Sequence, residues 1–165
     1  MANLKNNSDV EKMTRAGYEK LKQELTTLRK DGRLEVARKL EEARAFGDLS
    51  ENAEYHAATE EQEKLEVRIS RLEFKLNKAK VVDIDDIDTS HANLGTTVKI
   101  QDMDNKNSYT YMLVGTEEAD PNDNKISISS PVGRALMGRS IGEEVNVKTP
   151  KSMRRLKILA ITALN

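Results

Sequence analysis

Residues 58–79 read ATEEQEKLEVRISRLEFKLNKA, and this stretch decides the fold of the N-terminal half of the 165-residue chain. Positions at alternating intervals of four and three are uncharged and mostly apolar: Ala58, Gln62, Leu65, Ile69, Leu72, Leu76 and Ala79. This spacing lines them along one side of an α-helix and is typical of a coiled-coil seam. The stretch therefore predicts a long helix that packs against a second helix.

The second helix is predicted immediately upstream. A similar stripe runs through Tyr18, Leu21, Leu25, Leu28, Gly32, Val36, Leu40 and Ala43, and Thr14 before it suits an N-cap. Asp31-Gly32 is expected to loosen this helix locally. Between the stripes, Gly47 suits the C′ position of the first helix, and Asp48 or Ser50 can cap the second.

Two helices of about 30 residues joined by so short a turn must lie side by side and antiparallel. Each is about 45 Å long at 1.5 Å per residue. Such a hairpin is nearly all surface, which accounts for a composition of 33% charged and only 4% aromatic residues. The turn at 46–51 is therefore expected at the tip of the hairpin, about 45 Å from its base.

The C-terminal half has a different composition and contains all three prolines. Runs rich in β-branched and aromatic residues predict strands at Thr96–Gln101, Ser108–Val114, Lys125–Ser129, Glu143–Lys148 and Arg155–Thr162. Ser130 and Pro131 predict the start of a short helix at 131–137. We therefore expect an α+β protein with a disordered segment at 1–13, a coiled-coil hairpin at 14–80, an acidic linker at 81–93 and, at 94–165, an antiparallel sheet with one short helix.

Composition excludes several kinds of site. The 27 basic and 28 acidic residues give a net charge of −1, which argues against a strongly cationic nucleic-acid binder. The chain has no Cys and two His, which excludes disulfides, thiolate metal sites and a His-rich metal cage. Apolar runs are far shorter than the roughly 20 residues of a membrane helix. We expect a cytosolic protein. We also expect no self-sufficient active site, since the sequence has no Gly-rich phosphate loop, no GxSxG or HExxH motif and no Ser/His/Asp grouping.

The turn carries the residues most suggestive of chemistry. Asp48 and Glu51 lie three positions apart, and their carboxylates would share one face in the first turn of a helix. Two such groups can supply some of the oxygen ligands of Mg²⁺ or orient a water molecule. The alternative is a capping box, in which the same spacing only stabilises the helix start. The pattern alone leaves both interpretations open.

Side chains around this pair offer further contacts. Arg44, Asn52, Tyr55 and His56 flank it, and an Arg beside an aromatic ring can contact phosphate and stack on a base. We expect Phe46 instead to staple the hairpin end, and for Tyr55 both roles are open. Basic residues along the helices alternate with acidic ones, which favours a solvated face over an RNA guide: Lys20, Lys22, Arg29, Lys30, Arg33, Arg38, Arg68, Arg71, Lys75 and Lys78.

The segment 42–58 reads EARAFGDLSENAEYHAA and strongly resembles the tip signature of the Gre family of bacterial transcript-cleavage factors. Further similarities follow in family order and extend the resemblance over most of 14–162: Val114-Gly115, Glu117–Asp120, Ile126-Ser127, Ser130-Pro131 and Lys148–Pro150. The near-neutral charge is closer to the GreA branch than to the more basic GreB branch.

This resemblance implies a function in transcription. An FKBP-like C-terminal domain would dock on bacterial RNA polymerase through Asp120 and Pro131, and the hairpin would enter the secondary channel. There the catalytic residues Asp48 and Glu51 would hold a Mg²⁺ shared with the polymerase, with none bound by the free protein. Arg44, Asn52 and Tyr55 would contact RNA or the polymerase active centre.

The expected factor is not itself an enzyme. It would make the polymerase cleave its own backtracked RNA, and its partners would be bacterial RNA polymerase and the nascent RNA 3′ end, with no membrane and no small-molecule substrate. The main alternative is a channel-binding inhibitor that does not promote cleavage. One departure from the family is the basic segment Thr149–Arg155, which lacks an expected glycine pair.

Overall fold

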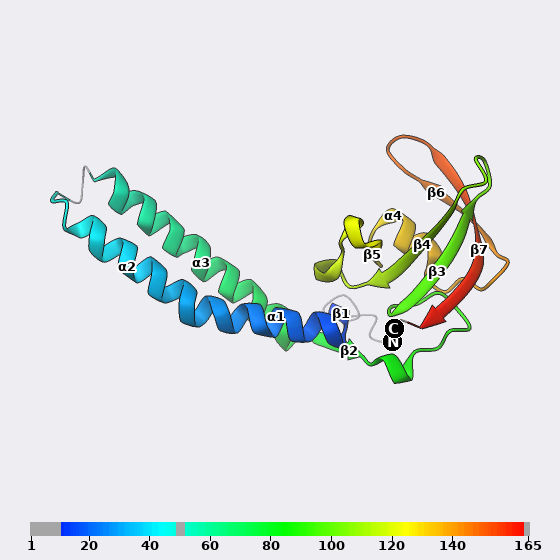
Figure 1. The fold of residues 1–165 in the computed structure, drawn as a ribbon, viewed down its shortest axis with the longest axis horizontal. Coiled ribbons are helices and arrows are strands. Elements are labelled where there is room, and N and C mark those ends of the chain that lie inside the picture. Colours follow the sequence, from blue (N-terminus) through cyan, green and yellow to red (C-terminus); the bar gives the residue numbers. More distant parts are fainter. Residues whose placement is uncertain (1–10, 49–51, 164–165) are drawn as a thin grey trace, which may run out of the picture. The chain divides into compact units, whose positions relative to one another are not determined.

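The structure of the protein is a computed structural model that describes residues 11–48 and 52–163. Its internal contacts divide the chain into two compact units, which we describe separately. One unit is Glu19–Lys78, and the other combines Met1–Tyr18 with Ala79–Asn165 (Figure 1). Within the described ranges, no helix is both long and apolar enough to cross a membrane. The α+β class expected from the sequence is confirmed.

The unit Glu19–Lys78 is a helical hairpin, whose first helix begins at Arg15 within the stretch Met1–Tyr18 of the other unit. Its first arm comprises α1 (Arg15–Thr27), a π-helical segment η1 (Leu28–Gly32) and α2 (Arg33–Arg44), and its second arm is α3 (Ala53–Asn77). Figure 1 shows the two arms side by side. The π-helical segment confirms the predicted local loosening at Asp31-Gly32. At Gly32 a Cβ atom would lie 3.1 Å from Leu65 Cδ1, so the missing side chain lets α3 approach closely.

The seam between the arms follows the predicted stripes. Its buried residues are Leu21, Leu25, Val36 and Ala43 on the first arm and Ala58, Ile69 and Leu72 on α3. Gln62, the one polar residue of the α3 stripe, is exposed. Removing these apolar side chains from water is the main force that holds two otherwise solvated helices together.

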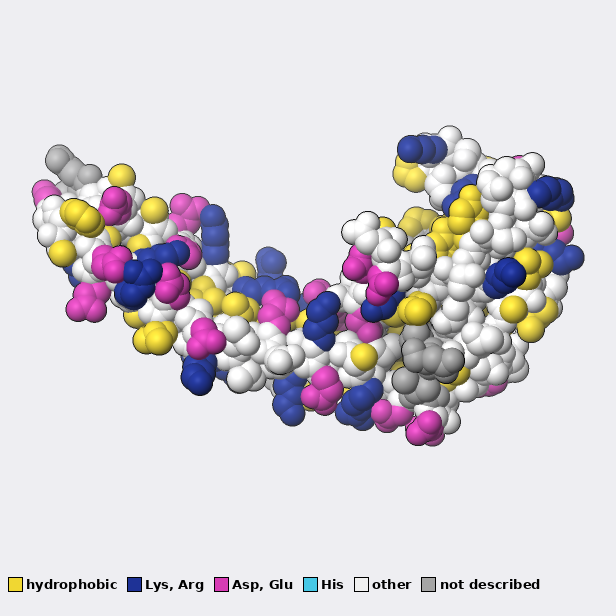
Figure 2. Space-filling view, in the orientation of Figure 1, with side chains coloured by type: hydrophobic (Ala, Val, Ile, Leu, Met, Phe, Trp, Pro, Cys, Tyr) yellow, Lys and Arg dark blue, Asp and Glu magenta, His cyan; other side chains and the backbone are white. Residues whose placement is uncertain are grey.

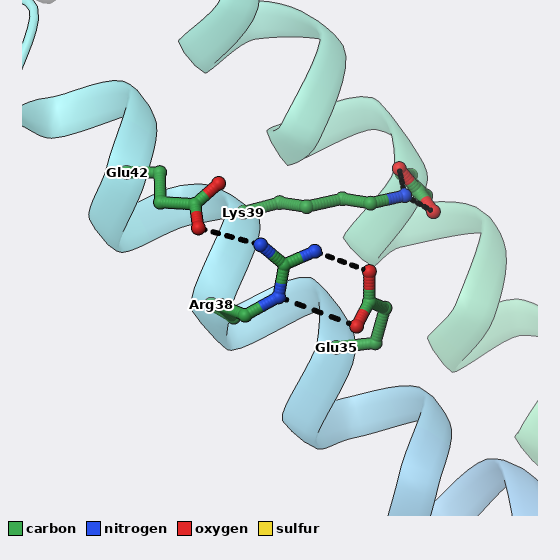
Figure 3. Close-up of polar contacts among 5 residues, drawn as sticks. Glu35, Arg38, Lys39 and Glu42 are labelled. Atoms are coloured by element: carbon green, nitrogen blue, oxygen red, sulfur yellow. Dashed lines mark hydrogen bonds and ion pairs between the residues drawn. The ribbon is translucent and has the colours of Figure 1, made fainter.

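Ion pairs connect the two arms outside the seam. They join Arg29 to Glu73, Arg33 to Glu66 at 2.9 Å, Lys39 to Glu61 at 2.7 Å and Arg68 to Glu24 at 2.7 Å. Within α2, Arg38 binds Glu35 at 2.6 Å and Glu42 at 2.5 Å (Figure 3). Figure 2 shows basic and acidic side chains alternating over the hairpin, as the sequence predicts. Much of its positive charge is thus paired internally.

The second unit contains a five-stranded sheet. Its strands are β3 (Thr96–Asp102), β4 (Ser108–Val114), β5 (Lys125–Ser127), β6 (Glu144–Lys148) and β7 (Met153–Ala163), in the order β5-β4-β3-β7-β6. These are the five predicted strands, with ends within two residues of the prediction. Neighbours are antiparallel except β5, which pairs parallel to β4.

The core of this unit lies between the sheet and α4 (Pro131–Leu136). It is built from ten buried apolar residues: Ala92, Val98, Ile100, Leu113, Leu136, Val145, Val147, Leu156, Ile158 and Ile161. Ser130 caps α4 as predicted, because its side chain accepts a hydrogen bond of 3.1 Å from the backbone N–H of Gly133. A Cβ on Gly133 would lie 2.0 Å from the carbonyl oxygen of Ser127, so only glycine allows α4 to pack this closely on β5.

A small parallel pair of strands joins the two ends of the hairpin sequence. β1 (Glu11–Thr14) pairs with β2 (Ala79–Val82), and the sequence analysis anticipated neither strand. The prediction of disorder at 1–13 is therefore wrong for Glu11, Lys12 and Met13, and its remaining part, 1–10, lies outside the described residues. β2 and a short 3₁₀ helix, η2 (Ile84–Asp86), occupy the start of the predicted linker.

The start of α1 is held by Glu118. The side chain of Thr14 accepts a hydrogen bond of 3.1 Å from the N–H of Gly17, which confirms its predicted role as N-cap. The Thr14 hydroxyl donates in turn to the Glu118 carboxylate. That carboxylate also accepts backbone N–H bonds of 3.1 Å from Thr14 and Gly115. One acidic side chain thus links the beginning of α1 to the end of β4.

Candidate functional site

The candidate site is the end of the hairpin where α2 gives way to α3. After Arg44, the backbone N–H groups of Ala45, Phe46 and Gly47 donate to the carbonyls of Glu42, Ala43 and Arg44 at 3.2, 3.2 and 3.4 Å. These bonds tighten the last turn and satisfy carbonyls that a helix end leaves unpaired. Gly47 has φ +113°, a left-handed conformation that ends the helix. The chain turns at Gly47, as predicted. Gly47 lies at C″ and not at the predicted C′ position, because Ala45 is the C-cap.

Asn52 caps the second helix. Its side-chain oxygen accepts a hydrogen bond of 3.1 Å from the N–H of Tyr55, and its amide nitrogen donates to the carbonyl of Ala43 at 2.6 Å. The same amide therefore starts α3 and ties it to the last turn of α2. Our assignment of the cap to Asp48 or Ser50 is wrong, because α3 begins at Ala53.

This boundary changes the interpretation of Asp48. The residue lies ahead of α3 and not in its first turn, so the capping-box explanation no longer applies to it. Its side chain is exposed. Glu51, its predicted partner, lies outside the described residues, as do Leu49 and Ser50.

The donors near the tip suit a shared metal site better than a complete one. Carboxylate oxygens are hard ligands of the kind that Mg²⁺ prefers, but Mg²⁺ requires six ligands in octahedral geometry. In the described part of the chain, no group of three or more His, Cys, Asp or Glu residues could hold a metal ion. Asp48 and Glu51 alone would leave most of these ligand positions to other groups, and the shared Mg²⁺ site stays a prediction.

Arg44 and Tyr55 form a second cluster across the hairpin end. The guanidinium carbon of Arg44 lies 5.9 Å from the centre of the Tyr55 ring, a cation–π contact between the last residue of α2 and the first turn of α3. His56 lies edge-on to Tyr55, with ring centres 6.2 Å apart. Tyr55 thus helps to hold the arms together, while the predicted contact of Arg44, Asn52 and Tyr55 with RNA or polymerase stays a prediction.

Phe46 does not staple the hairpin, and that prediction is wrong. Its side chain is 73% exposed. It borders a groove of about 370 Å³ between the arms, whose other lining residues are Lys39, Glu42, Ala43, Glu54, Ala57, Ala58 and Glu61. It also borders a second groove of about 420 Å³, shared with Asp48, Asn52, Ala53 and Glu54. Residue pattern alone could not predict this exposure, because Phe46 follows the stripe where a staple would lie.

The predicted docking residues lie on either side of β5 in the other unit. Asp120 is exposed, and its side chain caps a 3₁₀ turn, η4 (Pro121–Asp123), by accepting a bond of 3.0 Å from the N–H of Asn122. Pro131 is exposed at the first position of α4. Because β5 spans only Lys125–Ser127, these two residues flank the same short strand. Their proposed role in docking stays a prediction.

Comparison with known proteins shows which family the sequence matches. The family "Transcription elongation factor, N-terminal" matches residues 11–81, and the family "Transcription elongation factor, GreA/GreB, C-term" matches residues 87–163. "Transcription elongation factor GreA" of Chloroherpeton thalassium is 47% identical over 154 residues, which cover 93% of this chain and 98% of that protein. The protein of the same name from Thermodesulfovibrio yellowstonii is 46% identical over 150 residues, covering 91% and 95%.

Solved structures are similar as well. One titled "Crystal structure of GreA factor homolog 1 (Gfh1) protein of Thermus thermophilus" is 30% identical, covers 93% of this chain and 99% of that chain, and has a TM-score of 0.43. The two sequence families together span nearly all of the described residues. The chain therefore belongs to the GreA/GreB family of transcription elongation factors.

Proposed function

We propose that the protein binds bacterial RNA polymerase, inserts the end of its hairpin into the secondary channel and stimulates the polymerase to cleave backtracked RNA. In this proposal the protein is not an enzyme by itself. It contributes Asp48 and Glu51 to an active centre that the polymerase completes. Asp120 and Pro131 lie on the surface that docks on the polymerase.

The observation that carries the proposal is the position of Asp48. It is exposed at the closed end of a two-helix hairpin, and the N-cap of α3 is Asn52 and not Asp48. α3 has 25 residues, which at 1.5 Å per residue corresponds to about 37 Å. A hairpin of this length suits delivery of a side chain into a narrow channel.

The chain's own residues have distinct tasks in this proposal. Asp48 and Glu51 would supply part of the oxygen ligands of a shared Mg²⁺ and would accept a hydrogen bond from the attacking water. The metal, when bound, lowers the pKa of water and stabilises negative charge on the phosphoryl oxygens. Arg44, held over the Tyr55 ring, carries a charge that suits an RNA phosphate. Hydrolysis of one phosphodiester bond then releases a 3′ fragment and leaves a new 3′ hydroxyl end.

The test uses a purified, backtracked elongation complex. We expect the wild-type protein to accelerate shortening of the RNA, and Asp48→Ala and Glu51→Ala to lose that acceleration while still binding the polymerase. Glu63→Ala is the matched control, since it removes an exposed carboxylate from the middle of α3. Full cleavage by both tip variants would refute the roles of these residues. A wild-type protein that binds the complex and blocks extension without shortening RNA would instead support the inhibitor.

A further inference from the structure

Nearly every aromatic ring in this chain has a charged or aromatic partner. The sequence contains four Tyr and two Phe. A Lys or Arg lies over the ring in four cases, at 6.0 Å for Arg15 on Tyr18, 5.9 Å for Arg44 on Tyr55, 4.7 Å for Lys78 on Phe74 and 5.4 Å for Arg154 on Tyr109. Tyr111 stacks on Tyr109. Phe46 is the sixth ring, and no cation or ring among the described residues pairs with it.

The surroundings of Phe46 are acidic. Glu54 lines both grooves that border the ring, and Glu42 lines one of them. The neighbouring cations are already engaged, because Lys39 binds Glu61 at 2.7 Å and Arg38 binds Glu42 at 2.5 Å. Figure 3 shows the Arg38 guanidinium between Glu35 and Glu42. Glu54, in contrast, forms no ion pair with any residue at 11–48 or 52–163.

We propose that Phe46 and Glu54 together form a receptor for an Arg or Lys side chain on a segment of RNA polymerase. The face of a benzene ring carries partial negative charge and attracts a cation, and a carboxylate beside it adds a direct ion pair. The backbone bonds at Ala45–Gly47 fix the backbone of Phe46 before binding, so less conformational entropy is lost. Phe46 is then a positioning residue that orients the hairpin end.

Charge distinguishes this partner from RNA. An exposed ring can also stack on a base, but Glu54 lines both grooves beside the ring, and its carboxylate would repel the attached phosphates. A cationic protein segment therefore complements the surface, whereas a nucleic acid does not.

This inference rests on the proposed function for the identity of the partner, and binding tests it separately from cleavage. The affinity of the full chain is measured for RNA polymerase without nucleic acid and for the backtracked complex. Cation–π pairs of ordinary strength predict that Phe46→Leu weakens binding to both by roughly 3- to 30-fold. Phe46→Trp should restore most of the affinity, because it keeps an aromatic face that Leu lacks.

Two further variants complete the experiment. Glu54→Gln should also weaken binding, and the loss should shrink as salt rises because an ion pair is screened. Phe74→Leu is the matched control, since that ring lies on the same hairpin and already has Lys78 over it. Equal binding of Phe46→Leu and wild type, or full rescue by an aliphatic side chain, would overturn the proposal. A defect confined to RNA-containing complexes that varies with the 3′ nucleotide would overturn it in favour of base stacking.

Discussion

Replacement of Asn52 tests how the end of the hairpin is built. Asn52→Ala removes both bonds of the side chain, the one that caps α3 through Tyr55 and the one that reaches Ala43 on α2. Loss of an N-cap costs about 0.5–2 kcal/mol. Loss of a net hydrogen bond to a carbonyl adds about 0.5–1.5 kcal/mol. We therefore expect Asn52→Ala to lower the free energy of unfolding of the hairpin by about 1–3 kcal/mol.

Asn52→Asp removes only one of the two bonds. Asp is as good an N-cap as Asn, so the bond from the N–H of Tyr55 survives. The bond to Ala43 does not, because an ionised carboxylate has no hydrogen to donate. Asn52→Asp should therefore be less stable than wild type, and its difference from Asn52→Ala combines the cap with the effect of the new negative charge beside the Ala43 carbonyl.

The assay is urea unfolding followed by far-ultraviolet circular dichroism, which reports almost entirely on the hairpin since α4 in the other unit has only six residues. Glu63→Ala, a substitution of an exposed residue within α3, controls for changes in helix propensity. If Asn52→Asp were as stable as wild type, the bond across to Ala43 would contribute nothing. If Asn52→Ala were also unchanged, the cap assignment itself would be refuted.

Three further outcomes are expected from the structure. Gly133→Ala should destabilise the globular unit by about 1–3 kcal/mol in thermal unfolding, since the added methyl overlaps the Ser127 carbonyl; a gain in stability would contradict this packing. A hydrogen bond and charge from Arg38 lower the pKa of Glu35 below 4.5, so its stabilisation is complete above that value and is lost as pH falls through the lowered pKa. Glu35→Gln should flatten that acid dependence in urea titrations, and an unchanged slope would exclude the pair as its cause. Glu118→Ala should speed hydrogen exchange at the start of α1, because that carboxylate accepts two bonds there, from the backbone N–H and the hydroxyl of Thr14; unaltered protection would show that the contact is dispensable.

Local patterns in the sequence were enough for the hairpin and for most of the sheet. The seam residues Ile69 and Leu72 are buried where the heptad spacing puts them, and the chain turns at Gly47. Helix periodicity and turn chemistry depend on residues close together in the chain, so a single sequence contains them. The resemblance of the segment 42–58 to a known family is likewise a local property.

Other features depended on contacts between distant parts of the chain. Asp48, Ser50 and Asn52 are all good N-caps by residue type. Asn52 is the one that caps α3, and its amide also donates to the carbonyl of Ala43 on the other arm. The pairing of β1 with β2 could not be predicted from a turn motif, because the two strands are parallel and parallel strands are not joined by a tight hairpin. The sequence by itself therefore determined the two arms of the hairpin, the five strands of the sheet and where the chain reverses, but not the pair β1 and β2. Only the tertiary structure decided which side chain starts α3, which carboxylate holds α1 and that Phe46 faces solvent, because each depends on groups that folding alone brings together.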